Sequence, residues 1–163
     1  MNSTWPILIV LLAIAMALGP VLMMRPTPGQ RRLAAIRNEA IKRGLHVRLN
    51  QALAQHADYV LPFPQKPART PQTWALRKAK FEHALNFAGD WEWEGQPLPD
   101  EQLGALKELI AKAPPGLGGL GVNPAEVYAS WDEKLHQASL TAALDELSTF
   151  LGRLSDWATQ HSS

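Results

Sequence analysis

The sequence predicts an α+β fold: a single N-terminal transmembrane helix followed by a small cytoplasmic domain of about three helices and a short-stranded sheet. An uncharged run of twenty residues lies near the N-terminus, at Trp5–Met24. After it, stretches with helical periodicity alternate with short stretches of strand-like alternation. The chain has 163 residues, 46% of them hydrophobic, which suits one domain and excludes a disordered chain. We expect three to five short strands in the sheet, a number that is typical of a small domain.

The first predicted element is the apolar run itself. A helix of about 20 residues spans about 30 Å, the thickness of the hydrocarbon core of a bilayer. Trp5 at one end and Arg25 just beyond the other are residue types that favour the membrane interface. No Lys or Arg precedes the run, whereas a cleaved export signal begins with basic residues. We therefore expect an uncleaved membrane anchor.

The basic residues that follow the run predict its orientation. The stretch 25–48 holds seven Lys or Arg residues and a single acid, Glu39. The positive-inside rule then places the N-terminus outside and the C-terminal domain in the cytoplasm. We expect membrane-interface contacts with anionic headgroups from Trp5, Arg25, Arg31, Arg32 and Arg37. The alternative is that these arginines are solvated topological signals only.

The remaining elements follow from capping and spacing signals. The predicted domains are an anchor at 1–24, a basic juxtamembrane helix with the first strand at 25–48, and the rest of one α+β domain at 49–163. Thr27 and Gln30 form a capping-box pattern at the start of the first helix after the anchor. Apolar residues at spacings of three and four predict helices at 28–43, 100–113 and 139–160. Alternation predicts strands at 45–50, 59–63, 87–93 and 126–131.

Charge is distributed unevenly along the chain. The stretch 25–80 holds 12 basic and 2 acidic residues, and the stretch 81–163 holds 4 basic and 13 acidic residues. Such asymmetry indicates a partner or surface for the basic half. The anionic membrane is the partner we expect. Nucleic acid is a weaker alternative, because the distal half is too acidic.

Aromatic and acidic residues supply the remaining site candidates. Trp91, Trp93 and Trp131 are candidate partner contacts, since Trp is enriched at interfaces, although core anchoring is its more common role. Asp90, Glu92 and Glu94 alternate in the predicted strand at 87–93 and would share one face. Together they could bind a cation or supply an acid and a base, which gives a membrane-tethered enzyme as an alternative function.

Other motifs argue against catalysis and cofactors. The letters of Gly116–Gly121 match a dinucleotide-binding pattern, but two prolines precede the match and no helix follows, so we interpret it as a flexible loop. The five histidines lack metal-ligand spacing, and the chain contains no cysteine. We therefore predict no catalytic residues, no cofactor-binding residues, no metal and no small-molecule substrate.

The N-terminal region resembles one known family. The apolar run ends in Met24-Arg25-Pro26 and is followed by a helix containing Arg31 and Arg32. Over residues 7–48 this is similar to the start of YajC, the small accessory subunit of the bacterial Sec translocon. The resemblance implies a single span in a bacterial inner membrane, a cytoplasmic remainder and a role related to protein translocation. It ends after Gly44, and it carries over no functional residue.

These observations predict a non-enzymatic interaction or accessory subunit of a membrane protein complex. Its expected partners are membrane lipid and other inner-membrane proteins, with no cofactor. The two alternatives are the membrane-tethered enzyme and a membrane-tethered nucleic-acid-binding protein.

Overall fold

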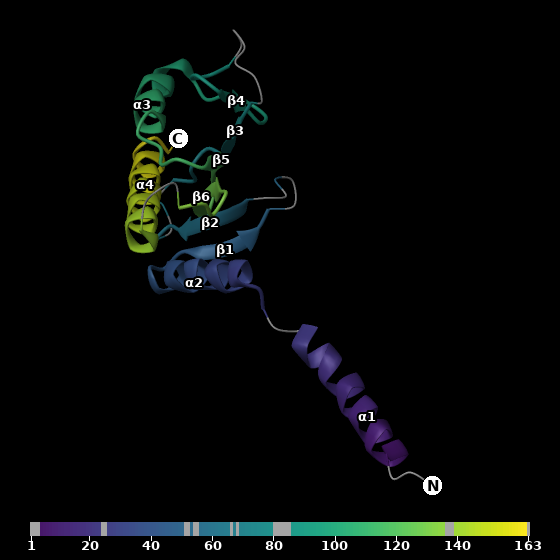
Figure 1. Cartoon of the computed structure of the whole chain (residues 1–163). Helices are drawn as coiled ribbons and strands as arrows, with labels where there is room; N and C mark the ends of the chain where they lie inside the picture. The colour runs from purple at the N-terminus through teal and green to yellow at the C-terminus, as the bar shows by residue number, and fades with distance from the viewer. Residues whose placement is uncertain are drawn as a thin grey trace. The chain divides into compact units, whose positions relative to one another are not determined.

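The computed structural model describes residues 4–23, 26–50, 53, 56–65, 67, 69–79, 86–135 and 139–162, without the side chains of 4 and 19–23. Its helices are α1 (Thr4–Met23), α2 (Pro28–Lys42), α3 (Asp100–Ile110) and α4 (Leu140–Gln160) (Figure 1). Its strands are β1 (His46–Leu49), β2 (Ala57–Pro62), β3 (Trp74–Lys78), β4 (Trp91–Trp93), β5 (Leu117–Asn123) and β6 (Glu126–Trp131). The chain divides into two compact units, Met1–Ala35 and Ile36–Ser163.

The first unit corrects the predicted membrane anchor. Within the described residues, no helix combines the length and the apolar character that crossing a membrane requires. A span needs about 20 consecutive apolar residues. The described side chains of α1 stop at Leu18, and Arg25 and the end of the predicted run lie outside the described set. The predicted transmembrane helix, the single-pass topology and the inner-membrane location were therefore wrong.

The start of α2 confirms the predicted capping box. The Thr27 N–H donates to Gln30 Oε1 at 2.9 Å, and the Gln30 N–H donates to Thr27 Oγ1 at 3.2 Å. This reciprocal pair satisfies two backbone donors that have no partner inside the helix. From Ile36 onward, α2 belongs to the second unit, where Ile36 and Ala40 are fully buried.

The second unit is built on one antiparallel sheet of six described strands. The strand order is β1-β2-β6-β5-β3-β4, and all neighbours pair antiparallel. The α+β class is correct, but the sheet is larger than the three to five strands expected. The two strands that the alternation did not predict are β3 and β5, and β5 begins at Leu117, within the Gly116–Gly121 segment interpreted above as a flexible loop. That interpretation was wrong because it weighed the glycines and overlooked the apolar residues between them.

Side-chain alternation gives the sheet one apolar face, and α3 and α4 both lie on that side (Figure 1). The α4 seam expected from its spacing is buried there, with Leu144, Leu147, Leu151 and Leu154 at 1% exposure or less. The same core contains side chains from the central strands: Tyr59, Leu76, Leu120, Val122, Val127, Ala129 and Trp131. Burying this face is the main stabilising contribution, at about 25 cal/mol per Å² of apolar surface removed from water.

Two glycine substitutions should change stability in opposite directions. A Cβ at Gly121 would lie 2.7 Å from the backbone oxygen of Trp74, which cannot move without disturbing β3. Gly121→Ala should therefore lower the free energy of unfolding by about 1–3 kcal/mol. A Cβ at Gly104 in α3 would meet nothing within 4 Å, so Gly104→Ala should raise it by about 1 kcal/mol.

The measurement is denaturant unfolding of the full chain and of both variants, followed by circular dichroism. Equal effects from the two substitutions would contradict the placement of Gly121 at the centre of the sheet.

Candidate functional site

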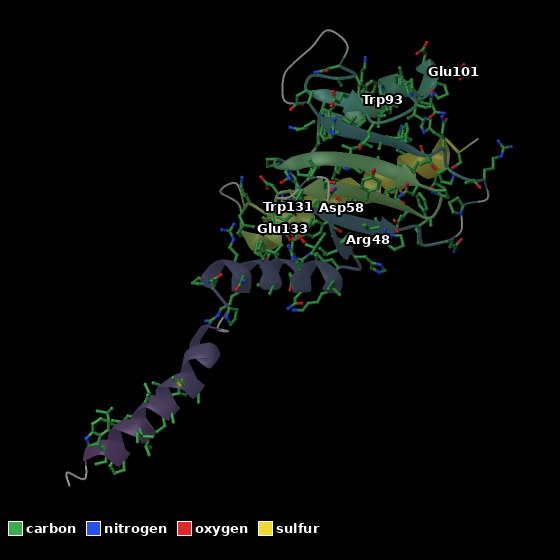
Figure 2. All side chains as sticks on the ribbon, turned by 90° about the vertical axis from the view of Figure 1, so that its right-hand side faces the viewer. Arg48, Asp58, Trp93, Glu101, Trp131 and Glu133 are labelled. Carbon is green, nitrogen blue, oxygen red and sulfur yellow. The ribbon has the colours of Figure 1, made fainter. Side chains whose placement is uncertain are left out.

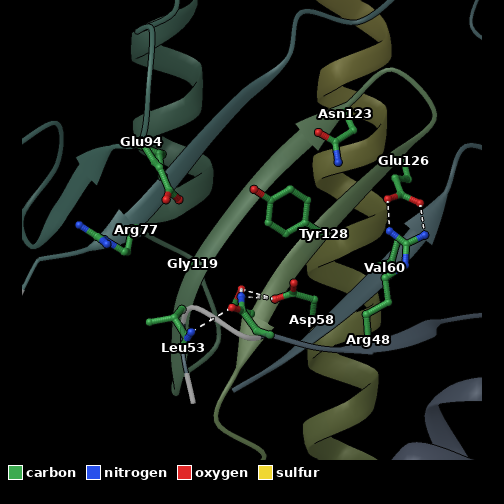
Figure 3. A pocket seen from close by; sticks show the side chains of 13 residues that line it. Arg48, Leu53, Asp58, Val60, Arg77, Glu94, Gly119, Asn123, Glu126 and Tyr128 are labelled. Carbon is green, nitrogen blue, oxygen red and sulfur yellow. Dashed lines mark hydrogen bonds and ion pairs between the residues drawn. The ribbon is translucent and has the colours of Figure 1, made fainter. Parts of the chain in front are cut away.

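The second face of the sheet, opposite α4, is polar and hollowed (Figure 3). We call it the open face. Its cavity has a volume of about 210 Å³. The charged and hydroxyl side chains that line it come from, or lie beside, β1, β2, β3, β4 and β6: Arg48, Asp58, Arg77, Glu94, Glu126, Tyr128 and Ser130. The open face therefore brings together charged and hydroxyl side chains from segments that lie far apart in the sequence.

A hydrogen-bonded cluster forms one side of this cavity. Asp58 Oδ1 accepts from the Ser130 hydroxyl and from Asn50 Nδ2, the latter at 2.8 Å. Asn50 Oδ1 accepts the Leu53 N–H at 2.9 Å, so the Asn50 side chain has partners at both ends of its amide. Ser130 is 2% exposed, so its hydroxyl needs such a partner. The Asp58 carboxylate is therefore held in place by uncharged donors.

The glycines of β5 make room for side chains from other segments. A Cβ at Gly118 would lie 2.6 Å from His56 Nε2, and a Cβ at Gly121 would lie 2.7 Å from the Tyr128 hydroxyl. Both side chains can therefore lie close to the β5 backbone, where any other residue would collide with them. The glycines of this segment allow close packing inside a sheet, and the segment does not form a dinucleotide-binding turn.

Tyr128 lines the cavity together with two carboxylates. In Figure 3 its hydroxyl is directed toward Glu94, and Asp58 lies beside its ring. Burial raises the pKa of Tyr128, and the negative charges of Glu94 and Asp58 raise it further. The phenol is therefore protonated at neutral pH, and its O–H remains available as a donor.

The two arginines of the cavity already have partners. Arg48 pairs with Glu126 through two contacts, Nη1–Oε1 at 2.6 Å and Nη2–Oε2 at 2.9 Å. Arg77 Nη2 donates to Glu92 Oε1 at 3.0 Å. Among the described residues, Glu94 is exposed and forms no ion pair.

The predicted acidic group is therefore divided. Asp90 pairs with Lys78 at 3.0 Å and Glu92 pairs with Arg77, so only Glu94 lines the cavity. Within the described part of the chain, no three His, Asp or Glu side chains are grouped to hold a metal ion. The alternating carboxylates do not converge on a shared reaction centre.

The tryptophans lie mainly inside the unit. Trp91 and Trp131 are 5% and 3% exposed, and Trp93 is partly buried and packs against Trp74 with its ring centroid 5.9 Å away. Trp131 Nε1 donates to the Pro115 carbonyl at 3.1 Å. A partner could reach Trp91 or Trp131 only by rearranging the core.

A buried ionic cluster joins α2 to the sheet. Arg37 donates from Nε and Nη2 to the two oxygens of Glu133, at 2.7 and 2.6 Å. The Tyr59 hydroxyl donates to Glu133 Oε1 at 2.9 Å. Glu133 is 6% exposed and adopts a positive φ of 56°, which a residue with a Cβ rarely does. Arg37, expected at a membrane surface, instead pairs with the buried carboxylate of Glu133, which is labelled in Figure 2.

Sequence reasoning missed this cluster and most of the open face. Residues 37 and 133 are 96 positions apart, so no local spacing connects them. The one available signal was Tyr59 on a predicted strand, which needs a partner for its hydroxyl when buried. Of the other expected interface residues, Trp5 is exposed on α1 at 72%, and Arg31 and Arg32 are exposed on α2.

The charge asymmetry also has an intramolecular explanation. Among the described residues, five ion pairs connect the basic stretch 25–80 with the acidic stretch 81–163: Arg37–Glu133, Arg43–Asp145, Arg48–Glu126, Arg77–Glu92 and Lys78–Asp90. These basic residues are thus paired with carboxylates inside the fold and are less available to an external anion.

Comparison with protein-family models, with curated proteins and with solved structures finds no match. The resemblance of residues 7–48 to YajC stays a prediction, without the transmembrane span that formed part of it.

The buried ion pair gives a stability prediction. Glu133→Gln keeps the shape but removes the charge that Arg37 and Tyr59 bind, so the free energy of unfolding should fall by about 2 kcal/mol. The loss is moderated because Arg37 is 32% exposed. Arg37→Met in the Glu133→Gln background should cost much less than in the wild-type background. Additive losses across this double-mutant cycle would show that the pair is not coupled.

The tyrosines give a pH prediction. Tyr59 and Tyr128 are the only tyrosines of the sequence, and the pKa of each is raised above its ordinary value, mainly by burial. A raised folded-state pKa stabilises the fold below the unfolded pKa of about 10, and this contribution is lost as the pH rises further. Ultraviolet titration of the folded chain should show less tyrosinate at pH 10 than the chain in urea, whose two phenols should each be about half ionised there. The same signal from the folded chain and from the chain in urea would mean that neither phenol is shielded.

Proposed function

We propose that this chain is a non-enzymatic interaction subunit and that its open face is the surface that contacts a partner protein. One observation carries the proposal. Both α3 and α4 lie on one side of the sheet, and the other side presents an ordered polar hollow.

The side chains of that surface are held in fixed positions, which supports a role in binding. Asp58, Ser130 and Asn50 are fixed by mutual hydrogen bonds, and Arg48 is fixed by its two contacts with Glu126. Side chains that are immobilised before binding lose less conformational entropy when a partner docks. Tyr128 adds an aromatic ring at the centre, and aromatic residues supply much of the energy of protein interfaces.

The experiment places a photoreactive amino acid in the full chain at Asn123, which lines the open-face cavity. A matched chain carries the same group at Glu101, an exposed residue of α3 (Figure 2). Irradiation in cells should give one discrete crosslinked protein from Asn123 and not from Glu101. The crosslinked protein is then identified by mass spectrometry and purified.

Binding of the purified partner provides the quantitative test. Tyr128→Ala should weaken its affinity for the full chain about tenfold or more, since loss of a central aromatic residue has effects of this size. Glu101→Ala should leave the affinity unchanged. The proposal fails if Asn123 gives no product, if both positions give the same product, or if Tyr128→Ala binds as tightly as wild type.

A further inference from the structure

The open-face cavity has an excess of negative charge. Its two cations, Arg48 and Arg77, each face a carboxylate of their own, Glu126 and Glu92. Two further carboxylates line the cavity, Asp58 and Glu94. Asp58 accepts hydrogen bonds from the neutral Ser130 and Asn50, and Glu94 forms no ion pair among the described residues. Neither carboxylate forms an ion pair among the described residues, and the positive charge that acts on Asp58 is that of Arg48, whose guanidinium is itself paired with Glu126.

These two carboxylates line the cavity together with Tyr128. Both negative charges act on the Tyr128 hydroxyl, and in Figure 3 Glu94 lies toward that hydroxyl while Asp58 lies beside the ring. The Tyr128 side chain lies over Gly121, where the absence of a Cβ lets it sit close to the β5 backbone. The result is a pocket lined by two carboxylates and an aromatic ring.

We infer that this pocket binds the guanidinium group of an arginine side chain from the partner protein. The inference rests on the proposed function and specifies its central contact. Guanidinium is planar, carries five donors and stacks on aromatic rings, so it can use both carboxylates and Tyr128 together. The volume of about 210 Å³ is below the roughly 300–1,000 Å³ of sites for whole small-molecule ligands. It suits a single side chain.

The first test uses a defined probe, the capped peptide acetyl-Gly-Gly-Arg-Gly-Gly-amide, and its citrulline analogue, which has nearly the same shape without the charge. Each is titrated into the ¹⁵N-labelled full chain. The arginine peptide should shift the backbone amide resonances of Glu94, Tyr128 and Ser130, with a dissociation constant on the order of millimolar. The citrulline peptide should shift none of them. Binding should weaken as salt is raised.

Charge-removing variants locate the site. Glu94→Gln should weaken binding of the arginine peptide about tenfold, and Asp58→Asn should have a similar effect. Glu94 is exposed, so its variant is expected to fold normally even if Asp58→Asn does not. Glu101→Gln removes an exposed carboxylate outside the cavity and should change nothing. The inference is overturned if the two peptides bind alike or if Glu94→Gln binds the arginine peptide as wild type does.

A third measurement separates this inference from the proposed function. If crosslinking from Asn123 keeps its wild-type yield in Glu94→Gln and the arginine peptide does not bind, the cation pocket is wrong and the interaction surface stands. If the arginine peptide binds as expected but Asn123 gives no crosslinked protein, the proposed function is overturned. The source of the guanidinium would then be a free small molecule, tested with methylguanidinium by the same titration.

Discussion

Successive side chains of a β-strand point to opposite faces of its sheet, and in the hairpin of β5 and β6 this alternation divides the second unit into two environments. Leu120, Val122 and Val127 point toward α4, and Gly119, Tyr128 and Ser130 belong to the other face. A shift of one residue in the pairing would move the apolar set into the polar hollow and the polar set into the core. The register of this central hairpin therefore fixes the packing of the helices and the composition of the open face together.

Electrostatics adds long-range constraints to this apolar framework. The Arg37–Glu133 pair connects α2 with the segment after β6, and Arg48–Glu126 connects the edge strand β1 with the start of β6. Exposed ion pairs contribute little to stability, but an unpaired Glu133 at 6% exposure would be costly. The buried pair thus contributes mainly by favouring one packing of α2, since an alternative packing would leave Glu133 without its cation.

The open face combines rigidity with unequal charge. Its arginines are paired with carboxylates of the same chain, whereas Asp58 and Glu94 form no ion pair among the described residues and lie beside a protonated Tyr128. The surface offers fixed donors, fixed acceptors and an aromatic contact in a small volume. The interaction that we propose, with a protein that presents a basic side chain, would use all three.

The sequence by itself determined the local elements whose signals lie within a few residues. The Thr27–Gln30 capping box, the leucine seam of α4 and the alternation of β6 were all readable because side-chain spacing and capping are local. The residues of β5 were not readable in the same way, because glycine disfavours a strand until neighbours such as Tyr128 occupy the space above it. Tertiary structure alone decided that Arg37 meets Glu133, that Glu94 separates from Asp90 and Glu92, and that Asp58 meets Ser130. Each of these outcomes depends on the order and register of the strands, which bring together residues that no spacing along the chain connects.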